Sequence, residues 1–256
     1  MSDVTDWGVP AVIGHRGAAG HAPENTLASL ETAAALGVRW VEFDVKLTRD
    51  SACVLFHDDT LGRTTDGKGK LADTTLAALR ALDAGSWFGP AFAGERVPTL
   101  ADAMVALARL GLGANVEIKP DPGRAAETGA AVARTLQAAW PRSLPAPLVS
   151  SFKPAALRAV RAQAPGLALA LNVLRFPRRW PQRLERLGCG AIHCLERELT
   201  LRRVRAFRSH GVAVRAFTVN DPARAEVLYR WGVAGVVSDH PERMLGGQAQ
   251  TASVRQ

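Results

Sequence analysis

The sequence WVEFDVKLT (residues 40–48) has the clearest strand pattern of the chain. Every second residue from Val41 to Leu47 is apolar, and every second residue from Glu42 to Thr48 is polar or charged. Because successive side chains of a strand point to opposite faces, this pattern predicts a strand with one apolar and one charged face. The stretch ANVEIK (residues 114–119) repeats it. The rest of the chain decides whether such a charged face meets solvent or the inside of a barrel.

Outward from these two stretches, short apolar runs alternate with helical patterns along the whole chain. The predicted strands are Ala11–Gly17, Trp40–Thr48, Ala114–Lys119, Leu148–Phe152, Leu167–Val173, Ala191–Leu195, Ala213–Val219 and Gly235–Asp239. The predicted helices are Pro23–Leu36, Leu100–Leu110, Pro154–Ala164, Leu201–Ser209 and Pro222–Trp231. Eight such units in 256 residues predict an α/β fold of the TIM (β/α)8 barrel type. A doubly wound open sheet is the alternative, but no glycine-rich phosphate fingerprint follows the first strand.

A ninth apolar run, Val54–Asp58, interrupts this count. Only five residues separate it from the second strand, whereas a parallel crossover needs about a dozen or more, so we expect an antiparallel hairpin. Residues 59–98 are rich in Gly and Thr, contain one helical pattern at Thr74–Leu82, and are predicted to be a small insertion over the barrel mouth. We expect a single domain over residues 1–246 and a disordered tail over 247–256.

The composition is that of a globular protein, with 47% hydrophobic and 22% charged residues. No run approaches the roughly 18 apolar residues of a membrane-spanning helix. The first twelve residues have no signal-peptide pattern, so we expect a cytoplasmic protein. Its three cysteines have no CxxC spacing and are expected to be reduced.

The net charge of +8 is unevenly distributed. Residues 140–215 contain fourteen Arg and one Lys against three Glu, a balance of +12, which leaves −4 for the remainder. Such a basic segment suggests an anionic partner, for example the surface of an anionic membrane in peripheral contact with the protein. A plain solvated basic face is the alternative.

Glu42, Asp44 and Glu117 occupy the charged faces of the second and third strands. If helices cover the outside of the barrel, these carboxylates point inward, where they would repel one another unless a cation lay between them. We therefore expect them to bind a hard divalent cation, Mg²⁺ or Ca²⁺. The alternative is a salt-bridged polar core that uses Arg16, Lys46 and Lys119.

Two histidines are expected near the same mouth, because His15 ends the first strand and His57 ends the hairpin. A pair of histidines can supply a general base and a general acid, while Arg16 and Lys119 can bind an anion. Together with a metal, these groups suit the cleavage of a phosphodiester. The remaining histidines have no ligand-spaced partner and are predicted to be structural or solvated: His21, His193, His210 and His240.

The ordered motifs of the chain resemble the bacterial, cytosolic type of the glycerophosphodiester phosphodiesterase family. They are GHRGAAGHAPENT, VEFDVKLTRD, VLFHDDTLGRTTDGKG, PTLADAM, NVEIK, SSF and FTVND, over residues 13–239. The resemblance implies a TIM barrel with an insertion after its second strand. It also implies a phosphoric diester hydrolase that uses Mg²⁺ or Ca²⁺ and converts substrates such as glycerophosphocholine or glycerophosphoethanolamine to sn-glycerol 3-phosphate and an alcohol.

The resemblance also suggests a role for individual residues. His15 and His57 correspond to the general base and acid. The other positions are metal ligands (Glu42, Asp44, Glu117), phosphate-binding residues (Arg16, Lys119), an aromatic wall for the glycerol moiety (Phe217, where similar enzymes often carry Trp) and supporting residues (Glu24, Asn25). The barrel rule adds Ser151 and Asn220 at strand ends. Two mechanisms remain open: a glycerol hydroxyl attacks phosphorus and expels the alcohol, after which water opens the cyclic phosphate, or water attacks phosphorus directly.

Two rival functions remain open. Aromatic residues near the insertion could admit an acyl chain and give lysophospholipase D activity: Phe56, Trp87, Phe88 and Phe92. Alternatively, the basic segment 140–215 binds nucleic acid or anionic lipid and the barrel is a non-catalytic scaffold. With only 6% aromatic residues and no nucleic-acid motif, we expect no nucleic-acid partner.

Overall fold

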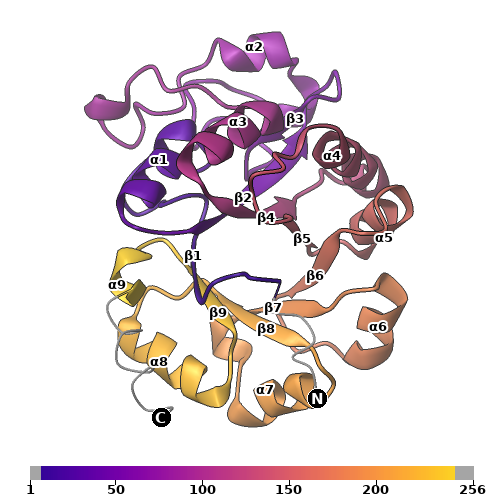
Figure 1. Cartoon of the computed structure of the whole chain (residues 1–256). Coiled ribbons are helices and arrows are strands. Elements are labelled where there is room, and N and C mark those ends of the chain that lie inside the picture. Colours follow the sequence, from indigo (N-terminus) through magenta and orange to yellow (C-terminus); the bar gives the residue numbers. More distant parts are fainter. Residues whose placement is uncertain (1–6, 246–256) are drawn as a thin grey trace.

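Eight parallel strands close into a barrel in the computed structural model, which describes residues 7–245. The barrel strands are β1 (Val12–Gly14), β2 (Trp40–Leu47), β4 (Gly113–Ile118), β5 (Leu148–Ser151), β6 (Ala168–Val173), β7 (Ala191–Leu195), β8 (Ala213–Phe217) and β9 (Gly235–Ser238). β1 pairs with both β9 and β2, which closes the barrel where the first and last strands lie side by side (Figure 1). The predicted TIM barrel is confirmed.

The ninth run forms β3 (Cys53–Leu55), which pairs antiparallel with the end of β2. Ser51 takes a positive φ of 61° in the tight connection between them. The predicted hairpin is therefore confirmed. The tail predicted at 247–256 lies outside the described residues.

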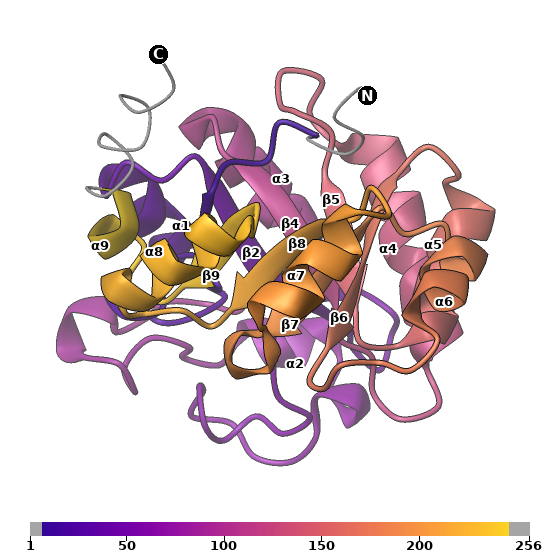
Figure 2. The ribbon, with the colours of Figure 1, turned by 90° about the horizontal axis from the view of Figure 1, so that it is seen from below.

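Helices surround the barrel (Figures 1 and 2). They are α1 (Leu27–Ala35), α3 (Leu100–Leu110), α4 (Ala125–Ala139), α5 (Pro154–Gln163), α6 (Trp180–Leu187), α7 (Leu201–Arg208), α8 (Pro222–Trp231) and the short α9 (Glu242–Leu245). The predicted start of the first helix at Pro23 is wrong, because Thr26 is the residue whose side chain accepts from Ser29 N and caps α1. α4 and α6 are absent from the predicted set; neither has a side-chain cap at its first turn.

Two apolar clusters hold the barrel together. The larger one fills the layer between the strands and the surrounding helices. A smaller one fills the interior at the amino ends of the strands, with Ile13, Trp40, Leu148, Ala170, Ala191 and Val237 at its centre. Further along the same inward faces the side chains become polar, so the interior is apolar at one end and charged at the other.

The segment between β3 and α3 has a small core of its own. It contains the 3-10 helix η1 (Leu71–Asp73), the helix α2 (Leu76–Arg80) and the 3-10 helix η2 (Pro90–Phe92); a third 3-10 helix, η3 (Glu196–Glu198), follows β7. Figure 2 shows this segment, with α2, along one end of the barrel. Phe56 is buried in its core, together with Leu61 and Leu79.

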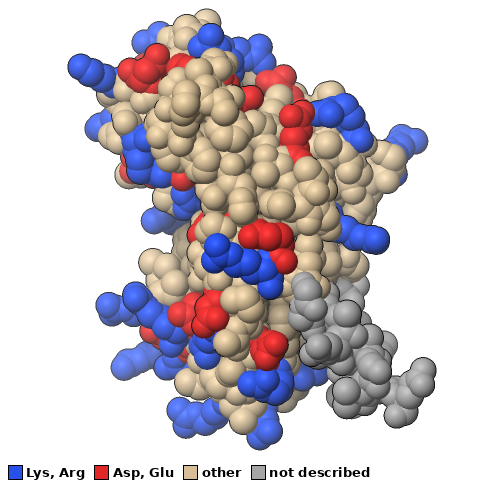
Figure 3. Space-filling model, turned by 90° about the vertical axis from the view of Figure 1, so that its left-hand side faces the viewer, with Lys and Arg blue, Asp and Glu red and all other residues tan. Residues whose placement is uncertain are grey.

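Acidic and basic side chains are interspersed on the face shown in Figure 3. Within residues 7–245, no helix is long and apolar enough to cross a membrane. The three cysteines are free, as expected; Cys189 and Cys194 are buried, which raises the pKa of each thiol to about 12.

Candidate active site

Three buried carboxylates meet at the carboxyl ends of β2 and β4. Parallel pairing places Asp44 directly opposite Glu117, and Glu42 lies on the same inward face of β2. One ligand oxygen from each of the three carboxylates lies within 4.8 Å of the others. The alternating pattern of residues 40–48 thus places the charged side chains inside the barrel. This is expected for strands whose outer face is covered by helices.

The electrostatics of this carboxylate cluster are unequal. Burial, and then the charge of Asp44, raise the pKa of Glu42 and of Glu117 to about 8. Burial would raise the pKa of Asp44 too, but Lys119, Arg16 and other groups outweigh it and lower that pKa to about 2. The nearby cations therefore stabilise one carboxylate of the three in its charged form.

The carboxylate cluster fits a hard divalent cation. Its donors are oxygens only, and Oε1 of Glu117 is buried without a hydrogen-bond partner among the described residues. A cation among the three oxygens would supply the missing partner and remove the repulsion that raises the two glutamate pKa values.

Two cations flank the cluster. Arg16 Nε lies 3.2 Å from an oxygen of Asp44, and Lys119 Nζ lies 3.5 Å from its other oxygen and 3.8 Å from Glu117. Lys46, by contrast, pairs with Asp59 at 2.6 Å and with Asp121. The two cations predicted to bind phosphate are thus brought together, whereas Lys46 connects β2 to the segment after β3.

The loop after β1 holds Arg16 in place. Glu24 accepts a hydrogen bond from Arg16 at 2.6 Å and two more from Arg63. These bonds outweigh the effect of burial and lower the pKa of Glu24. Asn25, at a positive φ of 58°, donates to Asp44 and accepts from the Asp44 backbone N–H. Asn25 thus contacts a residue of the carboxylate cluster, whereas Glu24 contacts Arg16 and Arg63.

An aspartate anchors His15. Its Nδ1 lies 2.6 Å from Asp239, and its Nε2 lies 3.9 Å from Glu42. Asn220 donates to the second oxygen of Asp239 at 2.8 Å and accepts from the Asp239 backbone N–H. A carboxylate at Nδ1 fixes the orientation of the ring and leaves Nε2 to face the carboxylate cluster.

His57 has a similar arrangement. Its Nδ1 lies 2.5 Å from Asp58, which also receives two hydrogen bonds from Arg63. Burial, with the nearby charges of Arg16 and Lys119, lowers the pKa of His57 below its usual 6.5, although carboxylates oppose this. Each histidine of the predicted pair is therefore held through Nδ1 by an aspartate.

The two remaining predicted residues lie in different settings. Phe217 is partly buried, packs edge-to-face on Phe152 with centroids 5.7 Å apart, and borders the apolar cluster inside the barrel. Ser151 donates to the Ile118 carbonyl and accepts from Lys153 N, bonds that join strand and helix ends. Neither of these hydrogen bonds connects Ser151 to another predicted site residue.

Several residues of the site were not predicted from the sequence. Asp239 follows β9 directly, so the rule that strand ends line the mouth could have found it. The same rule covers Asn172 on β6, which donates to Glu117 at 2.8 Å. Arg63 lies in the segment after β3, where no periodic pattern indicates which side chain turns toward the barrel.

Comparisons with known proteins agree with this geometry. Residues 15–243 match the model of the glycerophosphoryl diester phosphodiesterase family. A glycerophosphodiester phosphodiesterase of Caldanaerobacter subterraneus subsp. tengcongensis is 33% identical over 239 residues, which cover 91% of this chain and 96% of the relative. A glycerophosphodiester phosphodiesterase of Bacillus subtilis is 32% identical over 247 residues, covering 90% and 83%.

A solved structure is also similar. A phosphodiesterase of Oleispira antarctica, in complex with the product sn-glycerol-3-phosphate, superimposes with a TM-score of 0.92 at 42% identity and covers 94% of this chain and 98% of its own. The family match covers most of the sequence and includes every group of the site described above. This chain belongs to the glycerophosphoryl diester phosphodiesterase family.

Proposed function

We propose that the protein hydrolyses glycerophosphodiesters to sn-glycerol 3-phosphate and an alcohol at the carboxyl end of its barrel. The observation that carries this proposal is the pair of histidines, each anchored through Nδ1 by an aspartate, beside the buried carboxylate cluster. Membership of the family and the product named in the similar Oleispira structure support the same substrate class.

Glu42, Asp44 and Glu117 would hold Mg²⁺ or Ca²⁺. The bound ion would neutralise and polarise a phosphoryl oxygen. A salt-bridged core explains less, because Arg16 and Lys119 bring only the pKa of Asp44 below its ordinary value and do not offset the rise in the pKa of the two glutamates. Glu24, Asn25 and Asn220 act as supporting residues through their hydrogen bonds.

Arg16 and Lys119 bind the phosphate, since both cations lie beside the carboxylate cluster at its mouth. The planar, doubly anchored guanidinium of Arg16 suits two phosphate oxygens. Phe217, at the end of β8, offers an apolar ring to the carbon face of glycerol.

The histidines move the protons. His57, whose lowered pKa favours the neutral ring, accepts the proton of the attacking hydroxyl. If a glycerol hydroxyl attacks, the alcohol leaves and a cyclic phosphate forms, which water then opens to sn-glycerol 3-phosphate; if water attacks, this product forms directly. His15 donates a proton to the oxygen of the leaving alcohol. Asp58 and Asp239 orient the rings throughout, in the way that a carboxylate orients the histidine of a catalytic triad.

The decisive experiment measures release of sn-glycerol 3-phosphate from glycerophosphocholine. Purified protein is assayed after EDTA treatment and again with Mg²⁺ or Ca²⁺ restored. We expect activity to disappear with EDTA and return with at least one cation. Glu117→Gln should need more cation for half-maximal activity, whereas Glu226→Gln on the exposed face of α8 should not. Cation-independent activity would contradict the proposed metal role.

Lysophospholipase D activity is a second candidate, favoured by one feature of the segment after β3. Trp87 is 41% exposed there and packs edge-to-face on Phe88, which packs on Phe92. If this aromatic group receives an acyl chain, micellar lysophosphatidylcholine should be cleaved faster than glycerophosphocholine, and Trp87→Ala should reduce only the lysolipid rate. Equal losses on both substrates would count against it.

A further inference from the structure

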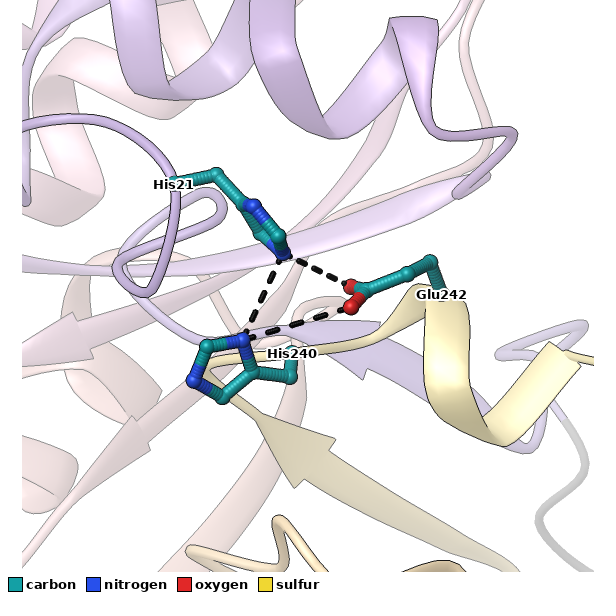
Figure 4. A group of neighbouring side chains, drawn as sticks. All are labelled: His21, His240 and Glu242. Carbon is teal, nitrogen blue, oxygen red and sulfur yellow. Dashed lines mark hydrogen bonds and ion pairs between the residues drawn. The ribbon is translucent and has the colours of Figure 1, made fainter.

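A second group of possible metal ligands lies outside the carboxylate cluster. His21 comes from the loop after β1, His240 from the turn after β9, and Glu242 from the first residue of α9. The three side chains converge, although 219 residues separate the two histidines (Figure 4). Their spacing in the sequence gives no indication of this meeting.

The separations of the donor atoms suit a tetrahedral ion. His21 Nε2 lies 3.0 Å from Glu242 Oε2 and 3.4 Å from His240 Nδ1, and His240 Nδ1 lies 4.0 Å from Glu242 Oε1. Ligands about 2.0–2.1 Å from a tetrahedral zinc ion are separated by roughly 3.4 Å. Small side-chain rotations would bring all three donors to that distance from one point.

Hydrogen bonds within this group do not provide a partner for every nitrogen and oxygen atom. The two ring nitrogens face each other, and only one proton fits between them. Oε2 of Glu242 is buried and has no hydrogen-bond partner in residues 7–245, despite the nearby His21 nitrogen. Arg243 Nε lies 3.6 Å from Oε1 of Glu242 and does not donate to Oε2. A cation would accept both ring lone pairs and the carboxylate oxygen together.

The local backbone is shaped around these rings. A side chain at Gly20 would bring its Cβ within 2.3 Å of the His240 ring, so the glycine allows the loop after β1 to lie against that histidine. The side chains of His21, His240 and Glu242 are 34%, 25% and 29% exposed, which leaves a path for an ion and a water ligand.

We propose that His21, His240 and Glu242 bind a zinc ion, with water as the fourth ligand. Two imidazoles and a carboxylate are a zinc-type donor set, whereas the all-oxygen carboxylate cluster suits Mg²⁺ or Ca²⁺. The zinc ion would join the loops that follow the first and last barrel strands. It would also fix the turn that begins at Asp239, the residue that anchors His15.

Cobalt(II) provides the test, because four-coordinate Co²⁺ with nitrogen ligands absorbs visible light far more strongly than six-coordinate Co²⁺ with oxygen ligands. Metal-stripped protein without a purification tag is titrated with Co²⁺, and bound Co²⁺ is then displaced with Zn²⁺. We expect the intense band in the wild type, its loss in His21→Gln and Glu242→Gln, and its retention in Glu117→Gln. His210→Gln is the matched control and should retain the band.

Thermal unfolding gives a second, spectrum-independent measurement. At about 100-fold excess over its Kd, Zn²⁺ should raise the unfolding midpoint of Glu117→Gln by roughly 5–10 °C. Adding His21→Gln to that variant should abolish the rise, while the metal-free midpoints of the two proteins stay equal. Absence of the band in the wild type, or its loss in Glu117→Gln with retention in His21→Gln, would overturn the second site.

Discussion

The two ends of the barrel interior differ in chemistry although the same strands build both. On β2, Trp40 belongs to the apolar cluster at the amino end, while Glu42 and Asp44 belong to the carboxylate cluster at the other. At about 3.3 Å per residue, Trp40 and Asp44 are separated by roughly 13 Å along the strand. A strand of eight residues thus contributes to stability at its start and to chemistry at its end.

Substitutions at the two ends should therefore have different effects. The apolar end contains none of the residues proposed to bind metal or phosphate or to transfer protons, so changes there should alter the free energy of unfolding. The charged end contains groups whose burial is unfavourable without a counterion, so changes there should alter activity and even increase metal-free stability.

The largest effect is expected from His57→Ala at the charged end. Loss of a general base should lower kcat by about 10²–10⁴-fold while the unfolding midpoint stays within a degree or two. Steady-state kinetics and thermal unfolding measure both. His210→Ala is the matched histidine control. A kcat above one tenth of the wild-type value would remove His57 from the mechanism.

At the apolar end, Trp40→Ala should destabilise the fold by about 3–5 kcal/mol. The ring packs directly on Gly113, so its removal leaves a cavity inside the barrel. Denaturant unfolding measures the loss, and the activity per folded molecule should stay within about twofold. If kcat falls as strongly as stability, the two ends are not separable.

The stability of the metal-free protein should depend on pH. The folded-state pKa of Glu117 is about 8, above its ordinary 4.5, because burial and Asp44 disfavour the charge. The folded state therefore binds more protons than the unfolded state between these values, and stability falls as the pH rises from 4.5 to 8.

Glu117→Gln should weaken this fall by on the order of 1–3 kcal/mol, and saturating Mg²⁺ or Ca²⁺ should abolish it in the wild type. Urea unfolding at pH 5 and pH 8, with and without cation, measures the effect. A pH-independent stability in the metal-free wild type would contradict the raised pKa.

The smallest effect is expected from Asn220→Ala. Asn220 contacts Asp239 rather than His15, so it acts as a positioning residue through a hydrogen bond worth about 0.5–1.5 kcal/mol. We expect kcat to fall by roughly 2- to 10-fold with KM unchanged. A rise in KM alone would show that Asn220 affects substrate binding instead.

The sequence predicts the barrel well because the signals for its strands are local. Alternation from Val41 to Leu47 and the short connection before β3 depend only on neighbouring residues, and both are found in the structure. The capped helices α3 and α8 were predicted with their observed bounds for the same reason. α4 begins after Arg124, whose side chain provides no cap, and was not predicted. α6 was missed although, like the predicted α5, it has a proline in its first turn.

The site was only partly predictable, because its supporting contacts join distant segments. The motifs contain both histidines and all three carboxylates, but the roles of these residues remain proposals. The contact of Asp239 with His15 spans 224 residues, and that of Arg63 with Glu24 spans 39. Such contacts depend on how the barrel closes and how the segment after β3 folds, which no local pattern specifies.

The pairing of β1 with β9 has a consequence for how the protein is made. Ile13 pairs with Val237, so a growing chain on the ribosome can assemble the inner carboxylates long before the strand that closes the barrel has been synthesised. Until then His15 lacks Asp239 and the first strand has one unpaired edge. We expect nascent chains that end before β9 to need protection from aggregation and to remain inactive, because closure comes last.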